Sequence, residues 1–111
     1  MYLFRPETVE SLWILHEITG DPKYREWGHR IFLAFEKHCK SRYGYGAHPD
    51  VTEPSMKCCR GNDDKQESFW LAETLKYLYL LMDPQQSMSL NDFTFTTEAH
   101  PLRVANHRTS R

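Results

Sequence analysis

The sequence lacks a long apolar run, carries almost no net charge and contains only five glycines. No stretch approaches the ~20 apolar residues of a membrane-spanning helix, so we expect no membrane segment in this piece. A net charge of -1 offers no attraction to a phosphate backbone, which argues against nucleic acid as a partner. The first residues also lack the charged and apolar regions of a secretion signal, so we expect no targeting signal in this piece.

Cysteines are few, and their number is odd. They are Cys39, Cys58 and Cys59. Because Cys58 and Cys59 lie in a polar loop, one of them could form a disulfide with Cys39. A zinc site built from Cys58, Cys59 and His48 is the alternative. We disfavour zinc because ligand pairs of structural zinc sites are usually roughly two to four residues apart, whereas these two cysteines are adjacent.

The sequence is instead rich in aromatic residues and in helical patterns. Aromatic residues make up 14% of the chain and hydrophobic residues 40%, as expected of a folded domain. A first pattern begins at Pro6 and stops before Gly20, which predicts a helix over about residues 6–19. Asp21 is an N-cap candidate for a second helix over about residues 22–40. The short turn between them predicts an antiparallel helical hairpin.

A third helix is expected from Glu67 to about Met82, after a long connection over residues 41–66 that contains several turn-forming residues. Its apolar residues surround most of its circumference, so it should be buried on nearly all sides. Three helices cannot enclose it completely, and we therefore expect further protein to pack around this chain. Without that protein, we expect four large apolar residues to lose their neighbours, namely Trp13, Trp70, Leu78 and Leu81.

Beyond the third helix the pattern becomes extended. Leu90, Phe93 and Phe95 predict a short extended segment that leads into residues 96–102. The last residues, 103–111, are polar and are expected to form a tail. The elements together predict an all-α fold with three main helices and a short extended segment near the C-terminus.

Carboxylates occupy the positions of greatest chemical interest. Glu7 and Glu10 lie three residues apart on one helix face. The helix start favours an ionised Glu7, which suits a general base, although simple capping of the helix is the alternative. Glu73 interrupts an apolar helix, where a carboxylate must be paired, hydrogen-bonded or functional; an ion pair with Lys76 is the alternative.

Thr97 and Glu98 follow the extended segment. A threonine can offer its carbonyl and hydroxyl oxygens to one hard cation, and an adjacent carboxylate can hold the water molecules bound to that cation. Two residues do not define a metal site by themselves, and an ordinary surface loop is the alternative.

Four segments resemble the family 47 glycoside hydrolases, which are class I α-1,2-mannosidases. They include the motifs Arg5-Pro6-Glu7 and Thr96-Thr97-Glu98, and their order and spacing also match. The resemblance implies that residues 1–102 are the C-terminal portion of a catalytic domain, which forms part of an (α/α)7 barrel, and that residues 103–111 are a polar tail. The four segments are residues 3–11, 20–28, 67–81 and 95–102.

The same resemblance implies a role for each candidate residue. Glu7 would act as the general base on the attacking water, and Arg5 would contact the terminal mannose. Thr97 would be the one protein residue that ligates calcium directly, through its carbonyl and hydroxyl oxygens. Four further residues would bind the sugar or the calcium-bound water molecules: Glu10, Phe69, Glu73 and Glu98.

The activity that the resemblance implies is calcium-dependent, inverting hydrolysis of terminal α-1,2-linked mannose from high-mannose N-glycans in the endoplasmic reticulum or Golgi. Inversion needs a second carboxyl as general acid, about 6.5–9.5 Å from the base. We expect the upstream part of the same catalytic domain to supply this acid, so this piece alone should be inactive. A degradation-enhancing mannosidase-like protein of the same family and a non-enzymatic helical interaction module are the alternatives.

Overall fold

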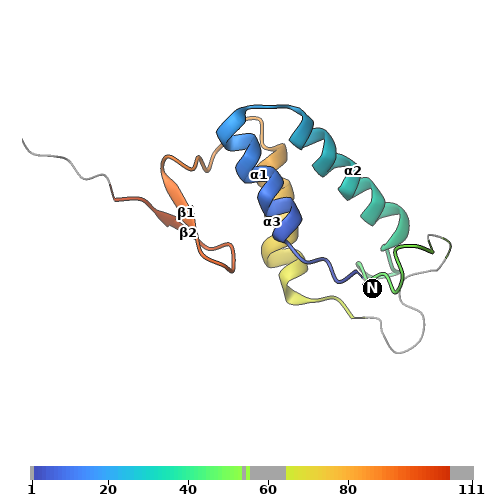
Figure 1. The fold of residues 1–111 in the computed structure, drawn as a ribbon. Coiled ribbons are helices and arrows are strands. Elements are labelled where there is room, and N and C mark those ends of the chain that lie inside the picture. The colour runs from blue at the N-terminus through green and yellow to red at the C-terminus, as the bar shows by residue number, and fades with distance from the viewer. Residues whose placement is uncertain (1, 54, 56–64, 106–111) are drawn as a thin grey trace, which may run out of the picture.

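The computed structural model describes residues 2–53, 55 and 65–105, which form a helical bundle with a small β-hairpin on one side (Figure 1). The predicted all-α fold with a short extended segment is confirmed. The third helix begins with a π-helical turn, which the sequence pattern did not predict. The elements are α1, Glu7–Thr19; α2, Lys23–His38; η1, the π-helical turn Trp70–Thr74; α3, Leu75–Met82; β1, Phe93–Phe95; and β2, Pro101–Arg103.

The turn between α1 and α2 forms as its residues predict. Gly20 adopts a left-handed conformation with φ of 68°, and its N–H donates to the carbonyl of His16 at 2.7 Å. Glycine adopts this conformation without steric cost, which is why it commonly follows the end of a helix. The carboxylate of Asp21 accepts the backbone N–H of Lys23 at 2.9 Å and so caps the start of α2.

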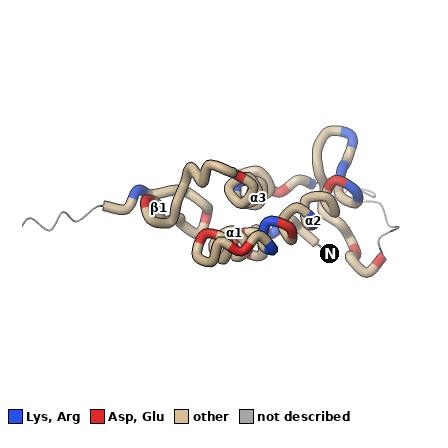
Figure 2. The backbone as a smooth tube through the Cα atoms, turned by 90° about the horizontal axis from the view of Figure 1, so that it is seen from above, with Lys and Arg blue, Asp and Glu red and all other residues tan. Residues whose placement is uncertain are grey.

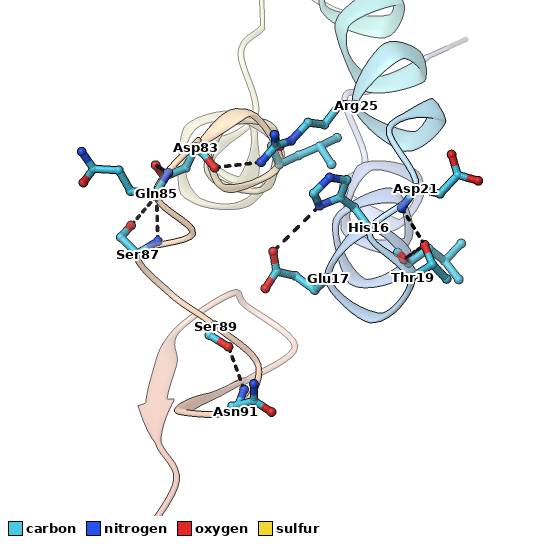
Figure 3. Close-up of polar contacts among 12 residues, drawn as sticks. His16, Glu17, Thr19, Asp21, Arg25, Asp83, Gln85, Ser87, Ser89 and Asn91 are labelled. Carbon is cyan, nitrogen blue, oxygen red and sulfur yellow. Dashed lines mark hydrogen bonds and ion pairs between the residues drawn. The ribbon is translucent and has the colours of Figure 1, made fainter.

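Helix α3 packs against both helices of this hairpin and, seen from above, lies to one side of them (Figure 2). Gly28 allows α2 and α3 to approach closely, because a Cβ atom at this position would lie 2.4 Å from Cδ2 of Leu81. Arg25 joins the same two helices (Figure 3). Its Nε donates to the carbonyl of Leu81 at 2.8 Å, and its Nη2 donates to the carbonyl of Asp83 at 3.0 Å.

The hydrophobic core lies between the three helices. Trp13, Trp70, Leu78 and Leu81 are all between 0% and 4% exposed, so the expectation that they would lose their neighbours is wrong. These side chains point inward, toward partners that the chain itself supplies. The ring centroids of Trp70 and Phe4 lie 4.4 Å apart, and those of Trp13 and Phe95 lie 4.8 Å apart.

Other large apolar side chains are exposed on the outer faces of the bundle. Leu71 is 61% exposed and Tyr79 is 72% exposed on η1 and α3, while Leu33 and Trp27 are exposed on α2. A helix that is apolar all round presents such a face when protein covers only one of its sides. Within the described part of the chain, no helix combines the length and apolarity needed to cross a membrane.

Strands β1 and β2 pair antiparallel, with Phe95 opposite Pro101 and Phe93 opposite Arg103. Strand β1 confirms the predicted extended segment, whereas β2 was not predicted. Pro101 has no N–H group to donate, but a proline is accommodated as the first residue of a strand. Residues 96–100, here called the β1–β2 loop, connect the two strands.

The long connection after α2 lies partly outside the described residues. Its described part makes two isolated bridges, one between Tyr2 and His48 and one between Lys40 and Tyr45. Cys39 is buried at the end of α2. Cys58 and Cys59 fall outside the described residues, so the disulfide and zinc hypotheses both stay untested; residues 106–111 of the predicted tail also fall outside.

Candidate active site

Three segments far apart in the sequence carry the predicted site residues. They are residues 4–10, which lead into α1; residues 69–77, which contain η1 and the start of α3; and the β1–β2 loop. The middle segment is hydrogen-bonded to both of the others. The three bonds run from Thr74 Oγ1 to the carbonyl of Phe4, from Lys76 Nζ to the carbonyl of Ala99 at 2.8 Å, and from Tyr77 Oη to Glu10 Oε1 at 3.3 Å.

The pKa of Glu73 reflects the charges of the other three predicted glutamates. Burial raises the pKa of the Glu73 carboxyl, and the negative charges of Glu98, Glu7 and Glu10 raise this pKa further. The nearby cation of Lys76 acts in the opposite direction. Carboxylates of the other two segments therefore act electrostatically on Glu73. The structure brings together the three segments that carry these residues.

Arg5 and Glu7 lie at the start of α1. Both side chains are exposed, whereas Phe4 and Pro6 next to them are buried. Glu7 occupies the first turn of α1, where the backbone N–H groups have no partner within the helix. A carboxylate in this position is accessible to water and able to accept a proton from it.

Tyr77 is a site residue that sequence reasoning missed. It is buried, and its hydroxyl donates to the carboxylate of Glu10. Burial and then the charge of Glu10 raise the pKa of Tyr77 above its ordinary value. The phenol thus stays protonated and remains a donor at neutral pH. Its position four residues after Glu73, on the same helix face, was the available signal.

The β1–β2 loop presents the predicted calcium ligand. Thr97 and Glu98 are both exposed in this loop, whereas the following Ala99 is buried. The loop is closed by hydrogen bonds between its two ends, from the Thr96 N–H to the carbonyl of His100 at 3.1 Å and from the Ala99 N–H to the carbonyl of Thr96 at 2.9 Å. The oxygens of Thr97 therefore lie at an accessible and well-defined turn.

The π-helical turn η1 follows directly after Phe69. Phe69 is half-buried and packs against the hydrophobic core. At the end of the turn, the N–H of Leu75 donates to the carbonyl of Trp70, five residues earlier. The turn that contains Glu73 therefore holds one residue more than an α-helical turn. Such single π-helical turns occur frequently at functional sites.

The donor chemistry fits a hard cation. The exposed groups of the site are the hydroxyl and carbonyl oxygens of a threonine together with carboxylates, and oxygen ligands of this kind suit calcium. Among residues 2–53, 55 and 65–105, no three His, Cys, Asp or Glu side chains are grouped closely enough to hold a metal ion by themselves.

Comparisons with known proteins agree with one another. The profile of glycosyl hydrolase family 47 matches residues 1–104. The chain is 49% identical over 109 residues to human mannosyl-oligosaccharide 1,2-alpha-mannosidase IC, which covers 98% of the chain and 16% of that protein. It is 50% identical over 100 residues to the endoplasmic reticulum mannosyl-oligosaccharide 1,2-alpha-mannosidase of Schizosaccharomyces pombe, covering 89% of the chain and 19% of that protein.

A solved structure supports the same relationship. The alpha-1,2-mannosidase from Trichoderma reesei matches 94% of this chain with a TM-score of 0.78 and 37% sequence identity, over 22% of its own length. The chain thus spans only about a fifth of these relatives and matches part of an (α/α)7 barrel, as expected. Because the family profile covers nearly the whole chain and the fold agrees with it, the chain belongs to glycosyl hydrolase family 47.

Proposed function

We propose that the protein to which this chain belongs is a calcium-dependent, inverting α-1,2-mannosidase that removes terminal mannose from high-mannose N-glycans. This chain supplies the general base and the calcium-binding part of the active site. The observation that carries the proposal is the meeting of the three segments that contain the predicted site residues, which hydrogen bonds from Thr74, Lys76 and Tyr77 hold together. The names of the relatives, which are mannosyl-oligosaccharide 1,2-alpha-mannosidases, support the substrate class.

The proposed reaction uses Glu7 as the general base. Glu7 removes a proton from a water molecule as the water oxygen attacks the anomeric carbon of the terminal mannose. A second carboxyl, which belongs to the upstream part of the catalytic domain, protonates the leaving oxygen on the opposite face. Arg5, which is exposed two residues before Glu7, would contact the sugar. One carboxylate cannot serve both faces of the sugar, so the chain alone is inactive.

Calcium, when bound, would orient the sugar hydroxyls and the water molecules around it. Thr97 would ligate calcium through its hydroxyl and carbonyl oxygens. Three glutamates would hold sugar hydroxyls or calcium-bound water, namely Glu10, Glu73 and Glu98. Tyr77 supports this role for Glu10, because its hydroxyl donates to one of the carboxylate oxygens of Glu10. Phe69 would pack against the sugar ring.

The upstream part of the same catalytic domain is the proposed partner of this chain. It would cover the apolar outer faces that carry Leu71 and Tyr79 on one side of the bundle and Leu33 on α2. We place the protein in the secretory pathway, in the endoplasmic reticulum or Golgi, where high-mannose N-glycans are processed. The name of the fission yeast relative supports this compartment.

Glu7→Gln in a complete catalytic domain that contains this chain tests the proposal. We expect kcat to fall by roughly a hundredfold or more while KM changes little, because glutamine keeps the shape of the side chain but cannot accept a proton. Glu26→Gln, on the exposed surface of α2, is the matched control and should leave both constants unchanged. An unaltered kcat in the Glu7 variant would leave this residue as a helix-start carboxylate without a catalytic role.

A further inference from the structure

Two residues next to the candidate site adopt a backbone conformation that non-glycine residues avoid. Phe4 has a φ of 61° and immediately precedes Arg5, while Ala99 has a φ of 58° and immediately follows Glu98. A left-handed conformation is sterically unfavourable for a residue with a Cβ atom. Such a conformation persists only where surrounding contacts hold it in place.

The cost is clearest at Ala99. The N–H of Ala99 donates to the carbonyl of Thr96, which closes a tight turn, and Ala99 then occupies the left-handed position that follows this turn. Hairpin loops of this kind normally have glycine at that position. An alanine there requires a compensating interaction. Without it, the turn that carries Thr97 and Glu98 would be free to adopt other conformations.

Lys76 provides such an interaction. Its Nζ donates to the carbonyl of Ala99 at 2.8 Å, across 23 residues of sequence, in a partly buried setting. A hydrogen bond from an ammonium group to a carbonyl is stronger than one between neutral groups. The other left-handed residue is held in the same way, since the hydroxyl of Thr74 donates to the carbonyl of Phe4. Both donors come from the short segment that ends η1 and begins α3.

We propose that Lys76 is a positioning residue for the calcium site, which it maintains by holding Ala99 in its left-handed conformation. The inference rests on the proposed function, because it concerns the affinity of the β1–β2 loop for calcium. The charge of Lys76, which acts on Glu73, would have the opposite effect on calcium binding, because it repels a second cation. If Lys76 acted mainly through its charge, its removal would strengthen calcium binding. If it acts by positioning, its removal weakens calcium binding.

The test measures binding of calcium chloride alone, without substrate, by calorimetry on a complete catalytic domain that contains this chain. We expect Lys76→Met to weaken calcium binding roughly 10- to 100-fold, as is typical when a group that supports a metal ligand is lost. Lys76→Arg, which can still donate to the Ala99 carbonyl, should retain most of the affinity. Lys37→Met, on the exposed face of α2, is the matched control for loss of a lysine and should have no effect.

A second substitution separates positioning from other roles. Glycine adopts the left-handed conformation at no steric cost. In an Ala99→Gly background, Lys76→Met should therefore weaken calcium binding by less than threefold. An equal loss in both backgrounds would overturn the proposal, as would unchanged or tighter binding after Lys76→Met alone. Should Lys76→Met fail to fold, recovery of folding in the double variant supports the proposal and failure of both variants overturns it.

The same measurements distinguish the two proposals. A wild-type domain that binds no calcium, or a Thr97→Ala variant that binds it as tightly as wild type, would contradict the proposed calcium site. A wild-type domain that binds calcium through Thr97 but is insensitive to Lys76→Met would contradict only the role of Lys76.

Discussion

Glu73 is the residue at which the conflict between stability and function in this site is clearest. Glu73 is partly buried. Its burial and the negative charges of three further glutamates raise the pKa of its carboxyl, and the cation of Lys76 lowers it. A carboxyl with a raised pKa opposes folding wherever the unfolded chain would hold it ionised. Residues of a binding site commonly carry such a cost, which a bound cation then offsets.

We therefore predict that Glu73→Gln stabilises the calcium-free catalytic domain at neutral pH. In the folded state the pKa of Glu73 lies above its ordinary value of 4.5. The stability that Glu73 contributes therefore falls as the pH rises from 4.5 through the raised pKa. The melting temperature of the variant should exceed that of wild type at pH 7, and the difference should shrink toward pH 4. Glu26→Gln, on exposed α2, should show no such pH dependence; a destabilised Glu73 variant at pH 7 would contradict the prediction.

Thr97 allows a second prediction at the residue scale. Thr97→Ala removes the hydroxyl but keeps the carbonyl, so one of two predicted calcium ligand atoms is lost. We expect calcium affinity, measured by calorimetry on the complete domain, to fall at least tenfold. Thr94→Ala, an exposed threonine of β1, should leave it unchanged. Equal affinities for wild type and Thr97→Ala would show that the threonine is not a ligand.

At the scale of elements, the π-helical turn connects the site. Its end and the start of α3 carry Thr74, Lys76 and Tyr77, which donate hydrogen bonds to the segment before α1, to the β1–β2 loop and to Glu10. These three residues are not among the predicted site residues. Each of them donates a hydrogen bond to a distant part of the chain. A single short segment thus holds together elements that lie about 70 residues apart in the sequence.

Thr74→Val tests the contribution of this segment to stability. Thr74 is fully buried, and valine has nearly the same shape but leaves the carbonyl of Phe4 without its donor. We expect the complete domain to lose about 1–3 kcal/mol in its free energy of unfolding. Thr19→Val loses two exposed bonds, one to the carbonyl of Leu15 and one from the N–H of Asp21, and water replaces them at a cost below about 0.5 kcal/mol. Equal losses in the two variants would argue against a special role for Thr74.

At the scale of the whole molecule, the chain has a packed core but uncovered outer faces. The four residues first expected to be exposed are buried, whereas Leu71, Tyr79, Leu33 and Trp27 remain exposed. The distinction matters because a buried core makes the three helices a coherent unit. We propose that the uncovered faces are where this unit meets other protein.

We predict that residues 1–111, expressed alone, associate in solution and do not release mannose from an α-1,2-linked mannobiose. Association follows from the apolar faces, and inactivity follows because the proposed general acid belongs to the upstream part of the catalytic domain. Light scattering should show species larger than a monomer. The double variant Leu71→Lys, Tyr79→Lys should reduce the association, because both side chains are exposed in the folded unit. A monodisperse wild-type monomer that releases mannose would contradict both parts.

The sequence by itself determined those features whose causes are local. Pro6, Gly20 and Asp21 mark helix ends by their own backbone and hydrogen-bonding preferences, so α1 and α2 were predicted to within two residues. The family was likewise recognisable, because its motifs lie in short contiguous segments such as Arg5-Pro6-Glu7. The roles of those motif residues in catalysis and calcium binding stay predictions.

Only the tertiary structure decided the features that depend on distant parts of the chain. The inward direction of Trp13 and Trp70 depends on which helix faces meet. Where a helix is apolar all round, hydrophobic periodicity cannot show which of its faces is covered. Strand β2 exists because β1 pairs with it, although Pro101 disfavours a strand locally. Lys76 reaches Ala99 for the same reason, since a bond across 23 residues forms only after the helices and the hairpin have packed together.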